Sequence, residues 1–334
     1  MMGCMKPKVC HKSGDILTSE EAGRYALVPF DPSNPDESND LKKNNTVYSY
    51  TKKCFEEVST LDFSRTYDIV EPATTPSSSL PIMTFVMVHG GGASRQMFQQ
   101  HAKILAEKKG HRSILLDLPG HGTLADTKLT LDSCAETVKS VLDENQESLK
   151  LTKANTIYVG ASFGAYTGFY TLDKLKDRFG GAVMMDCGQN VGPDCSWKAS
   201  AGLWFLKLLS KNMSNAGLMS TFKDVTAKSP ADWKLVESTF GAGMFFDSAV
   251  DQVHVLHSVK PADHIPNLDF PILFFNGSED YRDSEDKWLS LCKVREGSSL
   301  KVFEGGDHFF CHDSRFVFEM LDMMDKFAKD RIAA

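Results

Sequence analysis

Between residues 84 and 188, short apolar runs alternate with longer segments of helical period, and this alternation restricts the folds open to the chain. Apolar runs typical of buried strands lie at 84–90, 111–120, 155–161 and 180–188. Segments typical of amphipathic helices lie between them, at 95–110, 129–145 and 162–180. Strands that alternate with helices in this way are joined by right-handed crossovers. The pattern therefore predicts an α/β fold with a mostly parallel sheet flanked by helices.

The alternation stops after Gly188. Up to residue 264 the chain has helical stretches and no convincing strand, at 197–213, 231–244 and 248–260. Two further strand patterns, 270–280 and 299–310, are followed by a last helical segment, 314–330. We therefore expect a core made of residues 46–187 and 265–334, with residues 188–264 inserted as a helical cap. Such an insertion lies over the carboxyl edge of the sheet, where ligands bind in open α/β folds.

The ends and the composition of the chain exclude several classes of protein. Residues 1–45 are polar and without period, and are expected to be a disordered extension. A lipid anchor at Gly3 is disfavoured, because Pro7 stands where an acylation motif has Ser or Thr. A net charge of −7 without a basic block argues against nucleic acid as a partner. No apolar run approaches the roughly 20 residues of a membrane-spanning helix.

The cysteines indicate a reducing compartment. All eight stand singly, without a C-x-x-C pair or a regular framework: Cys4, Cys10, Cys54, Cys134, Cys187, Cys195, Cys292 and Cys311. The start of the chain also lacks the apolar core of a secretory signal. We therefore expect reduced thiols and a cytoplasmic location.

The strongest chemical signal is the pentapeptide Gly160-Ala161-Ser162-Phe163-Gly164. It joins a predicted strand to a predicted helix, which is the context of a nucleophile elbow. A serine on so tight a turn has a strained backbone, and the two glycines allow the strand and the helix to approach closely. The alternative is a Gly-rich turn whose serine only caps the helix. The context favours Ser162 as a nucleophile.

A Gly-rich turn at residues 89–92 follows an earlier buried strand. Acyl transfer needs two N–H donors directed at the oxyanion, and glycine lets the backbone face the substrate. We expect one donor from Phe163 and the other from Gly91, with Gly92 as the second choice. His89 is interpreted as a structural hydrogen-bonding residue. A phosphate-binding role is disfavoured, because no G-K-[ST] or G-x-G-x-x-G pattern is present.

His308 and an acidic residue complete the candidate catalytic set. His308 follows the last predicted strand, and an imidazole with a pKa near 6.5 can take up and return a proton at neutral pH. Asp280, after the preceding strand, is the preferred acid to orient it. The alternatives for the acid are Glu279, Asp283 and Asp186.

The order Ser162, Asp280, His308 resembles that of the α/β-hydrolase superfamily. Residues 117–122, Asp-Leu-Pro-Gly-His-Gly, are similar to a turn of that family, in which the histidine, here His121, is structural. The resemblance covers residues 46–334 and does not specify a subfamily; the overall pattern is similar to capped esterases, monoacylglycerol lipases, thioesterases and carbon–carbon bond hydrolases. It implies an α/β-hydrolase fold with an inserted helical cap. The serine at the elbow argues against epoxide hydrolases and haloalkane dehalogenases, which have an aspartate there.

These features indicate hydrolysis of a carboxylic ester or thioester through an acyl-enzyme, without metal or organic cofactor. Apolar residues at 202–209 and 244–246 could line an acyl pocket or simply pack on the core. His254 and His257 have no nearby acidic ligand and are interpreted as surface residues. An acyltransferase or a lyase with the same three residues remains an alternative. So does a non-catalytic receptor that binds a ligand on this scaffold.

Overall fold

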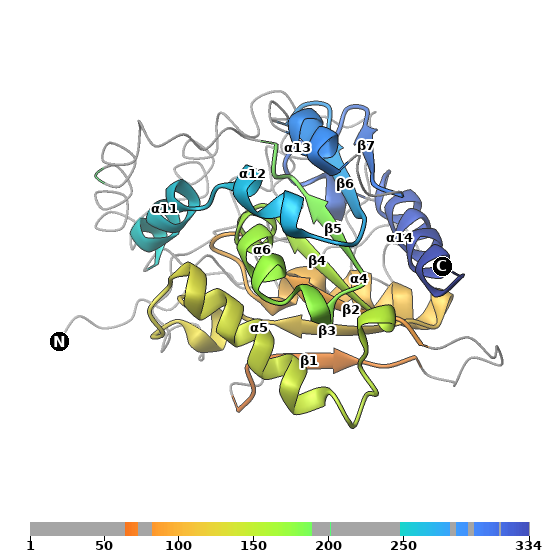
Figure 1. Ribbon diagram of the computed structural model, residues 1–334, viewed down its shortest axis with the longest axis horizontal. Helices are drawn as coiled ribbons and strands as arrows, with labels where there is room; N and C mark the ends of the chain where they lie inside the picture. Colours follow the sequence, from red (N-terminus) through yellow and green to blue (C-terminus); the bar gives the residue numbers. More distant parts are fainter. Residues whose placement is uncertain are drawn as a thin grey trace, which may run out of the picture.

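The computed structural model describes residues 64–72, 82–188, 201, 248–280, 285–292, 297–313 and 315–333. Its seven-stranded sheet has the order β1-β3-β2-β4-β5-β6-β7 (Figure 1). The strands are β1 (Tyr67–Val70), β2 (Thr84–Val88), β3 (Arg112–Leu116), β4 (Thr156–Ala161), β5 (Gly181–Met185), β6 (Ile272–Gly277) and β7 (Ser299–Phe303). Only β1 pairs antiparallel among these strands, and the other five pairings are parallel. The predicted α/β fold with a mostly parallel sheet is confirmed.

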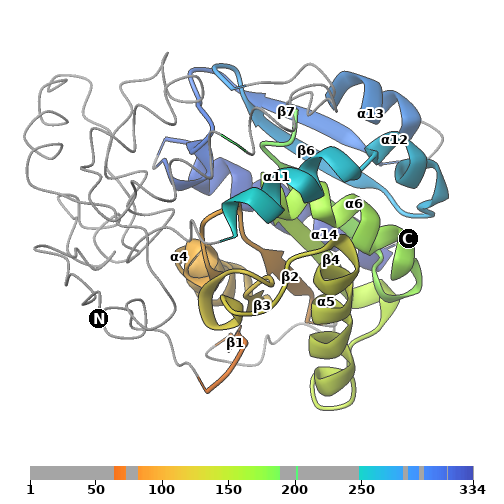
Figure 2. The same cartoon turned by 90° about the vertical axis from the view of Figure 1, so that its left-hand side faces the viewer.

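Helices cover both faces of the sheet (Figures 1 and 2). The α-helices are α4 (Gln99–Ile104), α5 (Leu131–Asn145), α6 (Phe163–Lys174), α11 (Ala249–Ser258), α12 (Pro261–His264), α13 (Glu285–Cys292) and α14 (Val317–Ala333). Short 3-10 turns lie at η1 (Arg95–Phe98), η3 (Gly122–Leu124), η4 (Lys153–Asn155), η5 (Lys176–Arg178), η8 (Ile265–Asn267) and η9 (Phe310–His312). A π turn, η2 (Leu105–Lys109), continues α4.

The core has two halves, one on each face of the sheet, because successive side chains of a strand point to opposite faces. In β2, Phe85 and Met87 pack with residues of α4 and α14, whereas Val86 and Val88 pack with residues of α5, α6 and α13. All four side chains are almost completely buried. A strand buried on both faces is continuously apolar, which is why its sequence shows no alternation.

The expected helices are found with altered ends. The segment 95–110 divides into η1, α4 and η2, and ends at Gly110, whose φ of 71° is typical of a glycine C-cap. The helix expected over 129–145 begins at Leu131, because Thr130 and Ser133 form a capping box. The helix expected over 162–180 ends at Lys174, and the 3-10 turn η5 follows.

Much of the predicted cap lies outside the described residues, as do the 1–45 extension and the segments 197–200, 202–213, 231–244 and 244–246. In the described part of the cap, α11 and α12 lie beside α6, and His264 Nδ1 of α12 is 2.8 Å from Asp173 Oδ2 of α6. The boundaries 188–264 therefore stay a prediction. No helix in the described ranges is both long and apolar enough to cross a membrane.

Four of the eight cysteines fall in the described residues, namely Cys134, Cys187, Cys292 and Cys311. All four are buried free thiols. Burial raises the pKa of Cys134 and that of Cys292 to about 12, so both are protonated at neutral pH. These four agree with the reduced cysteines expected from the sequence.

Candidate active site

Ser162 stands between the last residue of β4 and the first residue of α6. Its φ is 49° and its ψ is −115°, a conformation that costs a non-glycine residue about 1–3 kcal/mol. The Ser162 N–H donates to the carbonyl oxygen of Met185 at 2.8 Å, which ties the turn to the end of β5. Its side chain makes no capping hydrogen bond to α6. The geometry is therefore that of a tight strand-to-helix elbow and does not support the helix-capping alternative.

The two glycines of the elbow leave no room for a side chain. A Cβ at Gly164 would lie 2.4 Å from the carbonyl oxygen of Val88 and 2.6 Å from that of His89. A Cβ at Gly160 would lie 2.6 Å from the carbonyl oxygen of Gly164. Each neighbour is backbone and cannot rotate away. The close packing of α6 on β2 and β4 thus explains why both positions are glycine.

The structure brings Ser162, His308 and Asp280 together in one hydrogen-bonded series. His308 Nε2 is 3.0 Å from Ser162 Oγ, and His308 Nδ1 is 2.8 Å from Asp280 Oδ2. The three residues come from the β4–α6 turn and from the loops after β7 and β6. Because a carboxylate only accepts hydrogen bonds, the proton lies on Nδ1, which leaves the Nε2 lone pair free to accept from the serine hydroxyl. This arrangement can remove a proton from Ser162.

The surroundings of His308 act on its pKa in opposite directions. Burial lowers the pKa, whereas the charge of Asp280, its hydrogen bond and the charge of Asp307 raise it. The net effect is a pKa above the ordinary value of 6.5. Nearby carboxylates thus stabilise the imidazolium that forms when His308 takes up a proton.

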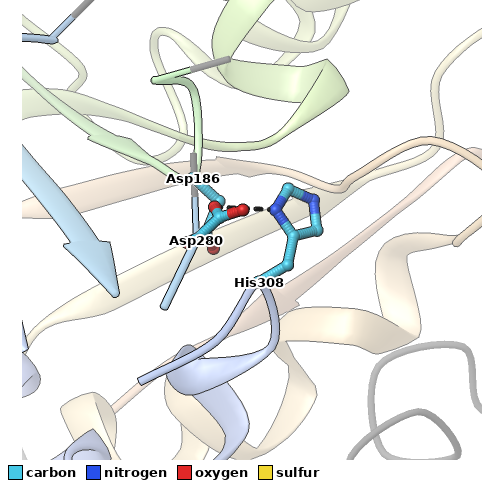
Figure 3. A group of neighbouring side chains, drawn as sticks. All are labelled: Asp186, Asp280 and His308. Carbon is cyan, nitrogen blue, oxygen red and sulfur yellow. Dashed lines mark hydrogen bonds and ion pairs between the residues drawn. The ribbon is translucent and has the colours of Figure 1, made fainter. Parts of the chain in front are cut away.

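The other candidate acids differ in position. Glu279 is fixed through its N–H, which donates to the Gly306 carbonyl oxygen at 2.8 Å, and Asp283 lies outside the described residues. Asp186 follows β5 and is 2% exposed. Asp186, Asp280 and His308 each have an atom of a type that can bind a metal, and these three atoms lie within 4.8 Å of one another (Figure 3). Asp280 is the residue with the hydrogen bond to His308, so it remains our choice of acid.

Within the described ranges, that same trio is the one group of three or more side chains of metal-ligating type. His254 and His257 on α11 belong to no such group in the part of the chain that the structure describes. The sequence predicts neither a metal nor an organic cofactor, and this stays a prediction.

Phe163, Gly91 and Gly92 are the candidate N–H donors of an oxyanion site predicted beside Ser162. The Gly92 N–H donates to His121 Nε2 at 3.0 Å, so it is already engaged. In the described part of the chain, the N–H groups of Gly91 and Phe163 have no such acceptor. This favours Gly91 over Gly92 as the partner of Phe163, in line with the order of preference from the sequence.

His89 and His121 hold the two turns that flank this site. His89 Nε2 accepts from the Leu118 N–H at 3.0 Å, and the two imidazole centroids are 4.9 Å apart. Burial lowers the pKa of His89 to about 4 and that of His121 to about 3, so both rings are neutral. Their hydrogen bonds agree with the structural roles expected for both.

Several residues that hold the turns around the candidate site were not predicted from the sequence. Arg95 is completely buried, and its guanidinium donates to Asp117 Oδ2 at 2.9 Å and to Asp68 Oδ2 at 2.7 Å. Asp117 Oδ1 also accepts the Arg95 N–H at 2.8 Å, which joins the two turns. Asp117 belongs to the Asp-Leu-Pro-Gly-His-Gly turn at residues 117–122, whereas Arg95 is one charged residue in an amphipathic helical pattern. No sequence signal distinguishes it from a solvated residue.

Two residues of the predicted cap also contact these turns. Ser248 Oγ donates to the Gly120 carbonyl oxygen at 2.8 Å, and Gln252 Nε2 donates to Ser248 Oγ at 3.0 Å. Gln252 Oε1 lies 2.5 Å from the place where a Cβ on Gly91 would be. The start of α11 is therefore packed directly against the candidate oxyanion turn. Ordinary polar residues on a helix give no such indication in the sequence.

Comparison with known proteins gives one family. The model of the alpha/beta hydrolase family matches residues 85–320. Solved structures with this fold include an esterase from Exiguobacterium antarcticum, with a TM-score of 0.60 at 14% identity over 79% of this chain and 94% of that one. A thermophilic esterase from Thermogutta terrifontis has a TM-score of 0.60 at 14% identity, over 80% and 99%. A bromoperoxidase from Bacillus anthracis has a TM-score of 0.60 at 16% identity, over 79% and 94%. No curated protein sequence gives a significant match.

The elbow glycines make a testable prediction about stability. We expect Gly164→Ala to lower the free energy of unfolding by about 1–3 kcal/mol or more, because the new Cβ meets fixed carbonyl oxygens. Gly90→Ala is the matched control, since its Cβ would have no neighbour closer than 3.6 Å. Urea unfolding of both variants measures the difference. Equal stability of the two would show that α6 can move away from the strands.

Proposed function

The chain belongs to the α/β-hydrolase family, and on this basis we propose that it is a serine hydrolase that cleaves a carboxylic ester or thioester. The observation that carries the proposal is the series Ser162 Oγ, His308 and Asp280, with hydrogen bonds of 3.0 and 2.8 Å. A weak nucleophile next to a base that is itself oriented by an acid is the arrangement of nucleophilic catalysis.

In the first half of the proposed reaction, Ser162 Oγ attacks the carbonyl carbon while His308 Nε2 takes the hydroxyl proton. The charge of Asp280 stabilises the resulting imidazolium. The carbonyl oxygen becomes an oxyanion, which the N–H groups of Phe163 and Gly91 stabilise. Loss of one such donor typically costs 10²–10³ in rate. His308 then returns the proton to the leaving alcohol or thiol, and an acyl-enzyme remains on Ser162.

The second half of the reaction repeats these steps with water. His308 removes a proton from water, which attacks the acyl carbonyl, and the imidazolium then protonates Ser162 Oγ as the acid leaves. Two of the structural neighbours described above are named esterases, which supports ester cleavage. We also propose a cytoplasmic location, which the four buried free thiols support.

The proposed acyl group is apolar and of moderate size. The proposal rests on the apolar composition at 202–209 and 244–246 within the predicted cap. In the described residues, α11 places Gln252 beside Gly91. Part of the predicted cap therefore lies next to the turn proposed to bind the carbonyl oxygen of the substrate. Binding of an acyl chain under the predicted cap is expected to be stabilised by about 0.8 kcal/mol for each CH₂ group removed from water.

Labelling with a fluorophosphonate probe tests the nucleophile. We expect the wild-type protein to be labelled at Ser162 and Ser162→Ala to remain unlabelled, because the probe phosphonylates only an activated serine. Mass spectrometry of the labelled peptide locates the adduct. Ser248→Ala, which removes another buried serine near the turns, is the control and should still be labelled. An adduct that persists in Ser162→Ala would place the nucleophile elsewhere.

The rate of labelling should depend on pH through His308. A raised pKa means that the imidazole stays protonated, and unable to accept a proton, to a higher pH than usual. The rate should therefore rise with pH and be half-maximal above pH 6.5. His89 and His121, with pKa values of about 4 and about 3, stay neutral over this range and do not contribute. A midpoint well below 6.5 would contradict the environment assigned to His308.

A series of p-nitrophenyl esters from acetate to palmitate tests the acyl group. We expect kcat/KM to increase with chain length over several CH₂ groups, by up to about fourfold for each, because each added group is buried. Parallel assays with thioesters, and with alcohols as acceptors, compare leaving groups and distinguish hydrolysis from acyl transfer. A kcat/KM that is highest for acetate would indicate a small-substrate esterase.

A further inference from the structure

The Gly-rich turn at residues 89–92 needs contacts from outside to hold its backbone. Glycine loses more conformational freedom on folding than any other residue, and the turn has three in succession. The Gly90 carbonyl oxygen and the Gly92 N–H are both engaged in hydrogen bonds, at 3.2 and 3.0 Å. In the described part of the chain, Gly91 between them makes no backbone hydrogen bond. Packing must therefore fix the direction of the Gly91 N–H.

Gln252 of α11 packs on Gly91. Its Oε1 lies 2.5 Å from the position that a Cβ on Gly91 would take. Since that Cβ would replace one of the Cα hydrogens, the amide oxygen faces this hydrogen and blocks movement of the turn towards α11. The Cβ of Phe163 lies 3.4 Å from the same position. Gly91 is thus in contact with side chains of both α11 and α6.

Hydrogen bonds fix which end of the Gln252 carboxamide faces the turn. Ser248 Oγ donates its one proton to the Gly120 carbonyl oxygen at 2.8 Å, so towards Gln252 it can only accept. The group that donates to it, at 3.0 Å, must then be Nε2, which leaves Oε1 directed at Gly91. Burial lowers the pKa of His121, and a hydrogen bond with Gln252 acts in the opposite direction. Polar contacts therefore hold this side chain in one orientation.

The helix that carries Gln252 is itself fixed to the core. Val255 of α11 and Val259, directly after it, are buried in the cluster that includes Phe163 and Phe169 of α6. The two helices lie side by side in Figure 2. A side chain on such a helix is positioned more accurately than one on a loop. Gln252 can therefore act as a rigid stop for the turn.

We propose that Gln252 is a positioning residue, which holds the Gly91 N–H in the direction needed to stabilise the oxyanion. It acts through Gly91 and does not itself contact the reacting atoms. The inference rests on the proposed function, because it takes Gly91 as an oxyanion donor. If Gln252 instead only attached α11 to the core, its replacement would affect stability and leave the rate of the chemical step unchanged.

Substitutions of different charge at Gln252 distinguish these roles. Removing an oxyanion donor typically costs 10²–10³ in rate, and loosening one should cost less. We expect Gln252→Met to lower kcat and kcat/KM for p-nitrophenyl acetate equally, by about tenfold. Gln252→Glu should lower both by about a further tenfold, since its charge repels the oxyanion at short range. A higher KM with kcat unchanged in both variants would overturn the proposal.

His254→Glu is the matched control for the added charge. His254 lies on the same helix and is exposed. An exposed charge is screened by solvent and salt, so we expect this substitution to change kcat by less than about twofold. A loss as large as that of Gln252→Glu would show that a charge anywhere on α11 lowers the rate, and would refute a specific role of Gln252.

Gly91→Ala tests the contact itself. In the wild-type background the new methyl group must displace Gln252 Oε1, so we expect Gly91→Ala to lower kcat by about tenfold, as Gln252→Met does. In a Gln252→Ala background the methyl group has room, and the further loss should be less than about threefold. Equal losses in the two backgrounds would contradict the proposal.

Backbone ¹⁵N relaxation of the Ser162→Ala protein makes the test independent of catalysis. We expect the order parameter of the Gly91 amide to fall in Gln252→Met, from about 0.85 towards about 0.6, and to stay unchanged in His254→Glu. If Gln252→Met does not fold, Gln252→Asn replaces it, because its side chain is one CH₂ shorter and cannot contact both Ser248 and Gly91. An unchanged order parameter would refute the proposal. A wild-type protein that hydrolyses no ester, but whose Gly91 responds to Gln252, would refute only the proposed function.

Discussion

At the start of α6 the helix backbone lies against the carbonyl oxygens that end β2, without space for a Cβ at Gly164. This contact forces the chain to turn within one residue, and Ser162 takes the positive φ that the turn requires. The same turn is held by the hydrogen bond to Met185 on β5. Rigid sheet packing therefore maintains a strained backbone, and the Ser162 hydroxyl lies beyond the end of β4, where it is hydrogen-bonded to His308.

The histidines of this protein differ in charge state because their neighbours differ. His89 and His121 are completely buried among backbone groups, and burial lowers their pKa values far enough to keep them neutral. His101 and His312, which stack edge to face near the loop of His308, are likewise buried with lowered pKa values. His308 alone among these has carboxylates that outweigh burial. The four neutral imidazoles thus differ in charge state from His308, whose protonated form its carboxylate neighbours favour.

The sequence was informative wherever backbone geometry restricts the residue type. The alternation of strands and helices, the glycines of the elbow and the order of Ser162, Asp280 and His308 all led to features that lie together in the structure. Contacts between distant polar side chains left no such signal. Arg95 and Gln252 look like ordinary surface residues in their helical patterns, yet one is fully buried and the other packs on Gly91. The proximity of Asp186 to Asp280 likewise depends on the pairing of β5 with β6, which periodicity does not specify.

The hydrogen bond from Ser248 to Gly120 has a consequence for how specificity can diverge in such a scaffold. The predicted core segment ends at residue 187, and Ser248, within the predicted cap, is bound to the turn that contains Gly120. The start of α11 is thus attached to turns of the core by its own side chains. An engineer who replaces the segment before Ser248 can therefore keep this attachment to the core while changing the residues ahead of it.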